Sequence, residues 1–130
     1  MAKTHSPGFI KVAEAARARI MEVQNDAVKA RLDRGERFVL LDVREDNEWA
    51  ASRLPHAEHL ARGILERDVE KRFPDPATEI VLYCGGGYRS ALAADTLRQM
   101  GYTNVRSLAG GFSGWTEKGF PLAGASEGKS

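Results

Sequence analysis

Cys84 stands at the head of a glycine loop that is suited to sulfur chemistry. Residues 81 to 101 read VLYCGGGYRSALAADTLRQMG, and the chain contains a single cysteine. Glycines allow backbone angles that other residues resist, so consecutive amide N–H groups can turn toward the sulfur. A helix that begins near Arg89 would add its unpaired amides and the positive end of its dipole. We therefore expect a thiolate, or an anion carried by the sulfur, to be stabilised there.

The same cysteine also has a plainer interpretation. A lone cysteine in an apolar strand is most often a small buried hydrophobic residue. However, packing a thiol does not require three successive glycines, each of which costs backbone entropy on folding. The glycines therefore favour a reactive thiol. Because there is one cysteine, an internal disulfide and a cysteine-rich zinc site are excluded, and Cys84 acts alone or with another molecule.

Composition limits the scaffold and the partners of this loop. A chain of 130 residues with 42% hydrophobic residues predicts one domain. Nineteen basic and eighteen acidic side chains leave a formal net charge of +1, so we expect no nucleic-acid partner. No apolar stretch approaches the roughly 20 residues of a membrane span, and no signal-peptide core follows the N-terminus. We therefore expect a cytoplasmic protein without a membrane partner, and the sequence leaves its oligomeric state open.

Apolar runs alternate with helix-like segments, which is the pattern of parallel strands joined by crossover helices. Because ligands bind beyond the carboxyl ends of such strands, Cys84 is expected at the functional edge of the sheet. The predicted strands are 20–24, 37–43, 57–61, 78–84 and 104–109, and the predicted helices are 9–20, 26–35 with Asn25 as its N-cap, 65–73, 89–101 and 110–119.

Several motifs agree in order and spacing with the single-domain rhodaneses. The stretch VLLDVREDNEW at 39–49 and the stretch YCGGGYRSALAADTLRQMGYTNVRSLAGGFSGWTEKGFPL at 83–122 resemble this family of sulfurtransferases, which shuttle sulfane sulfur on an active-site cysteine. The resemblance implies an α/β fold with a five-stranded parallel sheet, helices on both faces, and a persulfide on Cys84. We expect a helical N-terminal extension at 1–19, a rhodanese-like domain at 20–122 and a flexible tail at 123–130.

The loop residues are the expected substrate-binding groups around the catalytic Cys84. These are Gly85, Gly86, Gly87, Tyr88, Arg89 and Ser90. Arg89 either orients an anionic donor or pairs with a carboxylate and contributes only its amide. Tyr88 either forms a rim that selects substrates or packs on a neighbouring loop.

Other positions are expected to support the loop. Ser90 is expected to place a hydroxyl near the helix start and to bond N–H groups. Asp42 and Arg44 lie at a strand end on the same side of the sheet, where bracing is their expected role. The family commonly has glycines near Ser52 and His56, so the sequence between them predicts an altered turn.

The expected reaction is the transfer of sulfane sulfur from a donor such as thiosulfate to a thiophilic acceptor, cyanide or a thiol. It needs no metal or other cofactor, because the Cys84 thiolate is both consumed and regenerated. Two alternatives stay open. One is a non-catalytic interaction module that retains the fold. The other is a small cysteine-dependent phosphatase, although related phosphatases have five residues between cysteine and arginine and this chain has four.

Overall fold

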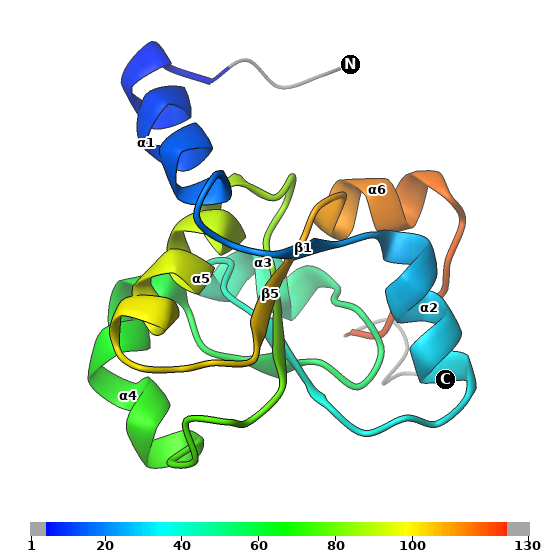
Figure 1. The fold of residues 1–130 in the computed structure, drawn as a ribbon. Coiled ribbons are helices and arrows are strands. Elements are labelled where there is room, and N and C mark those ends of the chain that lie inside the picture. Colours follow the sequence, from blue (N-terminus) through cyan, green and yellow to red (C-terminus); the bar gives the residue numbers. More distant parts are fainter. Residues whose placement is uncertain (1–4, 125–130) are drawn as a thin grey trace.

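A five-stranded parallel sheet organises the protein, as a computed structural model that describes residues 5–124 shows. The spatial order of the strands is β1-β5-β4-β2-β3, so the chain crosses over between neighbours as the sequence pattern predicts (Figure 1). The strands are β1 (Glu22–Val23), β2 (Val39–Asp42), β3 (Glu58–His59), β4 (Ile80–Tyr83) and β5 (Val105–Leu108). The predicted α/β class with five parallel strands is confirmed.

Helices cover both faces of the sheet. They are α1 (Pro7–Arg17), α2 (Asn25–Asp33), α3 (Asp46–Ala51), α4 (Leu65–Arg72), α5 (Tyr88–Gln99) and α6 (Gly111–Glu117), with a short 3-10 turn η1 (Arg62–Ile64). The segments of α3 and η1 carried no predicted helix. On one face the strands pack with α4 and α5, and on the other with α2 and α6. Both faces of β4 are therefore buried, which explains its uninterrupted apolar sequence.

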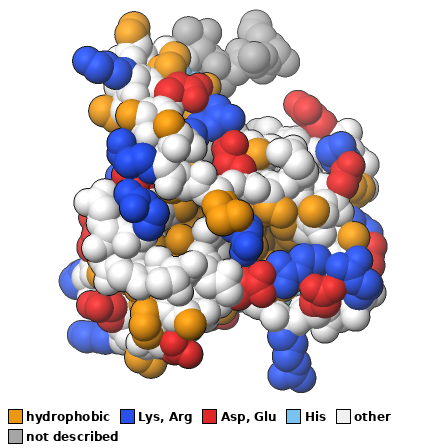
Figure 2. All heavy atoms as spheres, in the orientation of Figure 1, with side chains coloured by type: hydrophobic (Ala, Val, Ile, Leu, Met, Phe, Trp, Pro, Cys, Tyr) orange, Lys and Arg blue, Asp and Glu red, His pale blue; other side chains and the backbone are white. Residues whose placement is uncertain are grey.

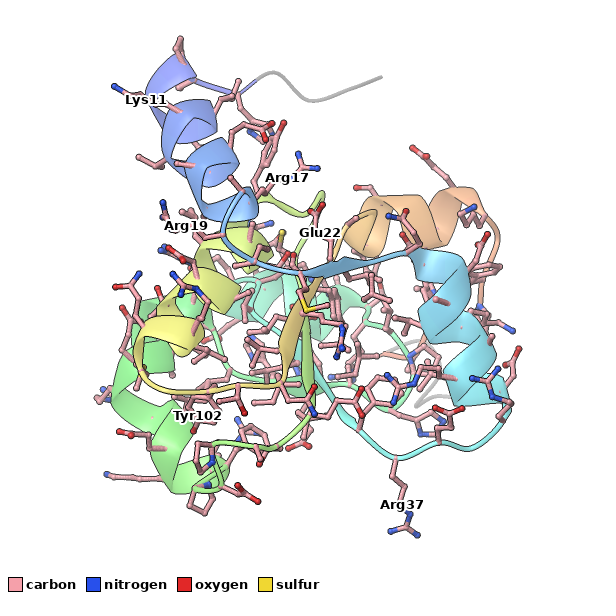
Figure 3. All side chains as sticks on the ribbon, in the orientation of Figure 1. Lys11, Arg17, Arg19, Glu22, Arg37 and Tyr102 are labelled. Carbon is pink, nitrogen blue, oxygen red and sulfur yellow. The ribbon has the colours of Figure 1, made fainter. Side chains whose placement is uncertain are left out.

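Helix α1 packs against α5 and extends beyond the body of the protein (Figures 1 and 2). Ala13 and Ala16 are fully buried in α1, and their small side chains allow close approach. Arg19 donates to the Asp95 carboxylate of α5 at 3.1 and 2.7 Å. At the junction with β1, the Arg17 guanidinium bonds Glu22 at 3.0 Å (Figure 3). The predicted N-terminal helix is therefore present and is fixed to the domain.

Asn25 corrects one sequence prediction. It does not cap α2, because Gln24 is the N-cap residue and no side-chain cap bond is present there. Instead, the buried Asn25 amide donates to the Gly111 carbonyl at 3.0 Å. A Cβ at Gly110 would lie 1.8 Å from the Asn25 side-chain oxygen. The Asn25 side chain therefore binds the start of α6, although the two residues lie far apart in the sequence.

One position of the predicted altered turn has a backbone conformation that favours glycine. His56 has a φ of +66°, the left-handed region that glycine enters most easily. Near Ser52, the neighbouring Arg53 pairs its backbone with Ala123 through bonds of 2.8 and 2.7 Å. The altered turn therefore lies beside the first residue of the expected tail, and residues 125–130 of that tail lie outside the described residues.

We expect Asn25→Ala to lower the free energy of unfolding by about 1–2 kcal/mol, because the Gly111 carbonyl would lose its buried partner. The measurement is urea unfolding followed by circular dichroism. The matched control is Asp26→Ala, which removes an exposed ion pair to Lys118 and should cost less than about 0.5 kcal/mol. Equal losses in the two variants would show that the buried amide bond has no special importance.

Candidate active site

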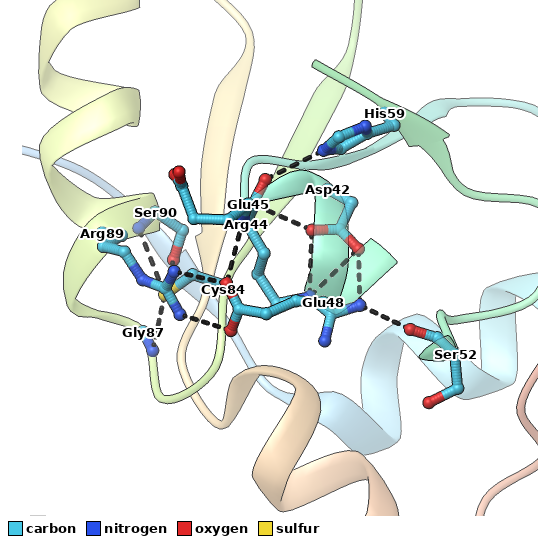
Figure 4. Close-up of polar contacts among 10 residues, drawn as sticks. All are labelled: Asp42, Arg44, Glu45, Glu48, Ser52, His59, Cys84, Gly87, Arg89 and Ser90. Atoms are coloured by element: carbon cyan, nitrogen blue, oxygen red, sulfur yellow. Dashed lines mark hydrogen bonds and ion pairs between the residues drawn. The ribbon is translucent and has the colours of Figure 1, made fainter. Parts of the chain in front are cut away.

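The Cys84 sulfur lies directly after β4 and faces the first turn of α5. Its residue is 1% exposed, and Sγ accepts the N–H groups of Gly87 at 3.1 Å and Ser90 at 3.3 Å (Figure 4). The Ser90 hydroxyl is 3.5 Å from Sγ and 2.8 Å from the hydroxyl of Ser107. Ser90 thus touches the sulfur through both backbone and side chain. Ser107, on β5, was not identified from the sequence.

The three loop glycines have different structural requirements. Gly87 has a φ of +105°, and a Cβ there would lie 2.6 Å from the Ala109 carbonyl oxygen. At Gly85 a Cβ would meet the Arg89 guanidinium at 3.2 Å, whereas at Gly86 it would enter open space. The sequence argument assigned conformational freedom to all three. The structure requires it at Gly87 alone.

Helix α6 holds the loop carbonyls away from the sulfur. The Phe112 N–H donates to the Cys84 carbonyl at 2.8 Å, and the Ser113 N–H donates to the Gly85 carbonyl at 2.9 Å. This approach requires Gly111, which has a φ of +57° and whose Cβ would lie 2.8 Å from the Cys84 oxygen. With their carbonyls bound by α6, these peptide units leave the space in front of the sulfur to N–H groups.

Arg89 points to a carboxylate on a different element. Its guanidinium bonds Glu48 of α3 at 2.8 and 3.2 Å (Figure 4). The hydrogen bond from Arg89 holds the pKa of Glu48 well below its usual range, at about 2. Of the two interpretations left open for Arg89, the structure shows pairing with a carboxylate. Glu48 had no predicted role, although it belongs to the Glu-Trp part of the motif at 39–49.

Asp42 and Arg44 form a buried ion pair beside the loop. Two guanidinium nitrogens of Arg44 bond the Asp42 carboxylate, at 3.0 and 2.8 Å, and one of them also donates to the Ser52 carbonyl at 2.7 Å. The guanidinium lies 4.2 Å from the ring centroid of Phe112 on α6. Neither side chain has a hydrogen bond to residues 84–90 among the contacts of the described chain. The pair therefore braces the turn after β2 and the start of α6.

Tyr88 packs on helix α1. Its ring makes edge-on contacts with His5 at 5.1 Å and with Phe9 at 5.7 Å between centroids. The two α1-side rings also contact each other at 5.1 Å. Tyr88 therefore packs as one of the two interpretations expected. Its partners are His5 and Phe9 of the predicted N-terminal extension and not a neighbouring loop.

One further arginine stands at this edge of the sheet. The Arg62 N–H donates to the Val43 carbonyl at 3.1 Å, which places its backbone beside β2. Within residues 5–124, Arg62 Nε is the one buried side-chain nitrogen or oxygen without a hydrogen-bond partner. Arg62 was not among the predicted site residues; it begins η1, and Val43, which accepts its N–H, itself donates to the carbonyl of Tyr83, the residue before Cys84.

Comparison with known proteins agrees with this geometry. The family model of the rhodanese-like domain matches residues 24–118. The chain belongs to the rhodanese-like domain family. This confirms the family predicted from the sequence motifs.

Relatives of this rhodanese-like domain include proteins named for sulfur transfer. The thiosulfate sulfurtransferase GlpE of Actinobacillus succinogenes is 36% identical over 88 residues, which is 67% of this chain and 77% of that protein. Bacillus subtilis YrkF is 34% identical over 99 residues, or 76% of this chain, and this chain spans about half of it (52%).

A solved structure resembles almost the whole chain. RPA3614 of Rhodopseudomonas palustris, a protein of unknown function described as a possible tyrosine phosphatase, has a TM-score of 0.79 and 30% identity. The superposition covers 95% of this chain and 99% of that chain. Across the described part of this domain, no helix has the length and apolar character needed to cross a membrane.

We expect Gly87→Ala to destabilise the domain by at least about 2 kcal/mol, because alanine would combine a left-handed φ with a clash against Ala109. Gly86→Ala, the neighbouring control, should change stability by less than about 0.5 kcal/mol. Urea unfolding of both variants provides the comparison. A tolerated Gly87→Ala would contradict the assigned backbone conformation.

The Arg89–Glu48 pair should make the free energy of unfolding depend on pH in the acid range. Because the folded-state pKa of Glu48 is about 2, below its ordinary 4.5, the carboxylate stabilises the fold above pH 4.5. That contribution is lost as the pH falls from 4.5 through 2. We therefore expect the unfolding free energy of the parent to decrease more over this interval than that of Glu48→Gln. Parallel urea curves at several pH values measure it, and identical acid dependence would rule out the contribution of Glu48.

Proposed function

We propose that this rhodanese-like domain is a sulfurtransferase that carries sulfane sulfur as a persulfide on Cys84. The observation that supports this best is the Cys84 sulfur itself, which accepts two amide N–H groups at the start of α5. Such amides stabilise negative charge on the thiolate and then on the outer sulfur of the persulfide. The sulfurtransferase names among the relatives support the same reaction class.

The reaction proceeds in two displacements. In the first, the Cys84 thiolate attacks the outer sulfur of thiosulfate, a new S–S bond forms, and the donor S–S bond breaks as sulfite leaves with the electron pair. In the second, the acceptor nucleophile attacks the outer sulfur of the Cys84 persulfide, and the thiolate leaves. Charge and atoms balance in each step, and neither step requires a cofactor.

The remaining residues have separate roles in this proposal. The Gly85, Gly86 and Gly87 peptide units shape the amide ring, and Ser90 supplies both an amide and a hydroxyl to the sulfur. Arg89 contributes mainly by fixing the loop to Glu48 of α3, since its charge is already paired. Asp42 and Arg44 brace the neighbouring turn.

Thiosulfate is our first proposed donor and a thiol our proposed physiological acceptor, with cyanide as a laboratory substitute. The name of the GlpE relative supports thiosulfate. A cytoplasmic location, where thiols are kept reduced, fits a reaction that depends on a free Cys84 thiolate.

The phosphatase alternative has one supporting observation, the description of RPA3614. In this chain, however, four residues separate Cys84 from Arg89, and the Arg89 guanidinium is bound to Glu48 rather than free for a phosphate. A non-catalytic module would not need Cys84, and Cys84 is present with two amide N–H groups on its sulfur. Sulfur transfer therefore accounts for more of the loop.

We expect Cys84→Ser to abolish sulfur transfer while the fold is retained, because serine has a similar volume but forms no persulfide. Intact mass spectrometry after incubation with thiosulfate should show a gain of about 32 Da on the parent that cyanide removes. The serine variant should show none.

Circular dichroism provides the control that Cys84→Ser is folded, and hydrolysis of an aryl phosphate tests the alternative. Efficient phosphate hydrolysis by the parent, with no cyanide-sensitive mass gain, would overturn the proposed function.

A further inference from the structure

We propose that Arg62 is the anion-recognising residue of the active site. Its guanidinium binds the sulfonate of thiosulfate, or the carboxylate of a small thiol acceptor, while the sulfur of the same compound reacts at Cys84. The ligand chemistry common to both is an oxyanion group carried a few atoms away from a reacting sulfur. The inference rests on the proposed function and assigns a further specificity-determining residue to that same site.

Arg62 begins η1 at the edge of the sheet where Cys84 lies. Its N–H donates to the Val43 carbonyl at 3.1 Å, and the Val43 N–H donates to the Tyr83 carbonyl at 3.0 Å. Val43 is therefore level with Cys84, and Arg62 lies one strand further along the same edge. Neighbouring strands are about 4.8 Å apart, so the backbones at Arg62 and Cys84 are separated by roughly 10 Å. An arginine side chain and a substrate of a few atoms together span such a gap.

The chain that leads to Arg62 runs along the face of the sheet to which Cys84 belongs. Leu60, two residues earlier, is 4% exposed and packs in the same buried cluster as Val43 and Cys84. Ala61 lies between Leu60 and Arg62 with an extended backbone, at φ −58° and ψ 143°. Because side chains two positions apart in an extended segment share a face, Arg62 lies on the Cys84 side of the sheet.

The Arg62 side chain has a buried stem and no partner. Its Nε is buried without a hydrogen bond, and within residues 5–124 no carboxylate forms an ion pair with its guanidinium. The two terminal nitrogens are not among the buried unpartnered atoms, so the fork stays open to solvent. A buried charged donor without an acceptor is costly, and an anionic ligand at the fork would supply acceptors.

The other arginines near this edge are already engaged. Arg89 and Arg44 are each bound to a carboxylate (Figure 4). Arg53 has no carboxylate partner in the described part of the chain, but its guanidinium lies over the Trp49 ring, 4.4 Å from the centroid. Arg62 is therefore the cation best placed to bind an oxyanion that approaches the Cys84 sulfur.

Two carboxylates increase the need for a cation here. Glu45 and Asp46 line a hollow of about 460 Å³ between the start of α3 and η1, with Ala61 and Gly63 on its other side. Neither carboxylate forms an ion pair with Arg62 in the described structure. Because like charges repel, an oxyanion that enters along this hollow depends on the Arg62 charge for binding.

The chemistry of the guanidinium suits such a ligand. Its planar fork places two N–H donors against two oxygens of a carboxylate or sulfonate, which gives both energy and orientation. In the donor step the bound sulfonate becomes the leaving sulfite. In the acceptor step the carboxylate holds the thiol while its thiolate attacks the outer sulfur. The bonds formed and broken are those of the two displacements above, and Arg62 only donates hydrogen bonds.

The test measures sulfur transfer with anionic and neutral partners, using the full chain. Intact mass follows the loading of Cys84 by thiosulfate, a gain of about 32 Da, and its loss when the loaded protein meets 3-mercaptopropionate or 2-mercaptoethanol. We expect Arg62→Met, which keeps an unbranched stem, to lower the second-order rate constants for thiosulfate and 3-mercaptopropionate about tenfold or more. The constant for neutral 2-mercaptoethanol should change less than about twofold. Arg62→Lys, which keeps the charge without the fork, should fall between parent and Arg62→Met.

Arg67→Met is the matched control, because it removes the same charge from an α4 side chain that is 71% exposed. It should leave the ratio of anionic to neutral acceptor unchanged, and a change equal to that of Arg62→Met would refute the inference. Circular dichroism checks folding. Should Arg62→Met unfold, Arg62→Gln and Arg62→Lys provide the same comparison.

An effect confined to thiosulfate, or to 3-mercaptopropionate, would support the inference and identify sulfonate or carboxylate as the ligand. Unchanged constants with both anionic compounds, or equal losses with 3-mercaptopropionate and 2-mercaptoethanol, would show that Arg62 does not recognise the oxyanion. Absence of any cyanide-sensitive sulfur on the parent would instead overturn the proposed function, a result distinct from an unchanged ratio.

Discussion

The loop around Cys84 depends on the bonds that α6 makes to its carbonyl groups. A peptide unit that aims its N–H inward must aim its C=O outward, and an outward carbonyl near a buried strand end needs a donor. The first amides of α6 supply it, at 2.8 Å to Cys84 and 2.9 Å to Gly85. This approach in turn requires glycine at 111 and at 110, and Asn25 of α2 closes the back of the same turn. Elements from three parts of the chain thus define the space in front of the sulfur.

Charge at the site is arranged differently from what a count of arginines suggests. Arg89 and Arg44 both stand near the cysteine, and each has a carboxylate partner. In the proposed reaction their role is therefore positional, and stabilisation of sulfur anions falls to the amides of Gly87 and Ser90. Amides act at short range and carry no net charge, so they favour an anion at one point without attracting every anion in solution.

The sequence predicted the core of the fold because the buried strands are marked by continuous apolar runs such as that of β4. The helix α3 escaped prediction since it is six residues long, has no buried residue and is defined by the reciprocal bonds of Glu45 and Glu48. Asn25 was misassigned for a related reason. The preference for asparagine at helix starts predicted a cap, but the hydrogen bond to Gly111 determines where the Asn25 side chain lies.

The residues of the candidate site were likewise predicted only where local sequence marks them. Cys84 and its glycines are recognisable because they are adjacent in sequence. Glu48, Ser107 and Phe9 are brought to the loop only by tertiary folding, and neither charge nor periodicity of their own segments marks them. The seam between α1 and α5 also has a mechanical consequence. Tyr88, which packs on Phe9 of α1, is the first residue of α5 and stands two positions before Ser90, whose amide the Cys84 sulfur accepts. A displacement of α1 would therefore act first on the helix end that holds the sulfur.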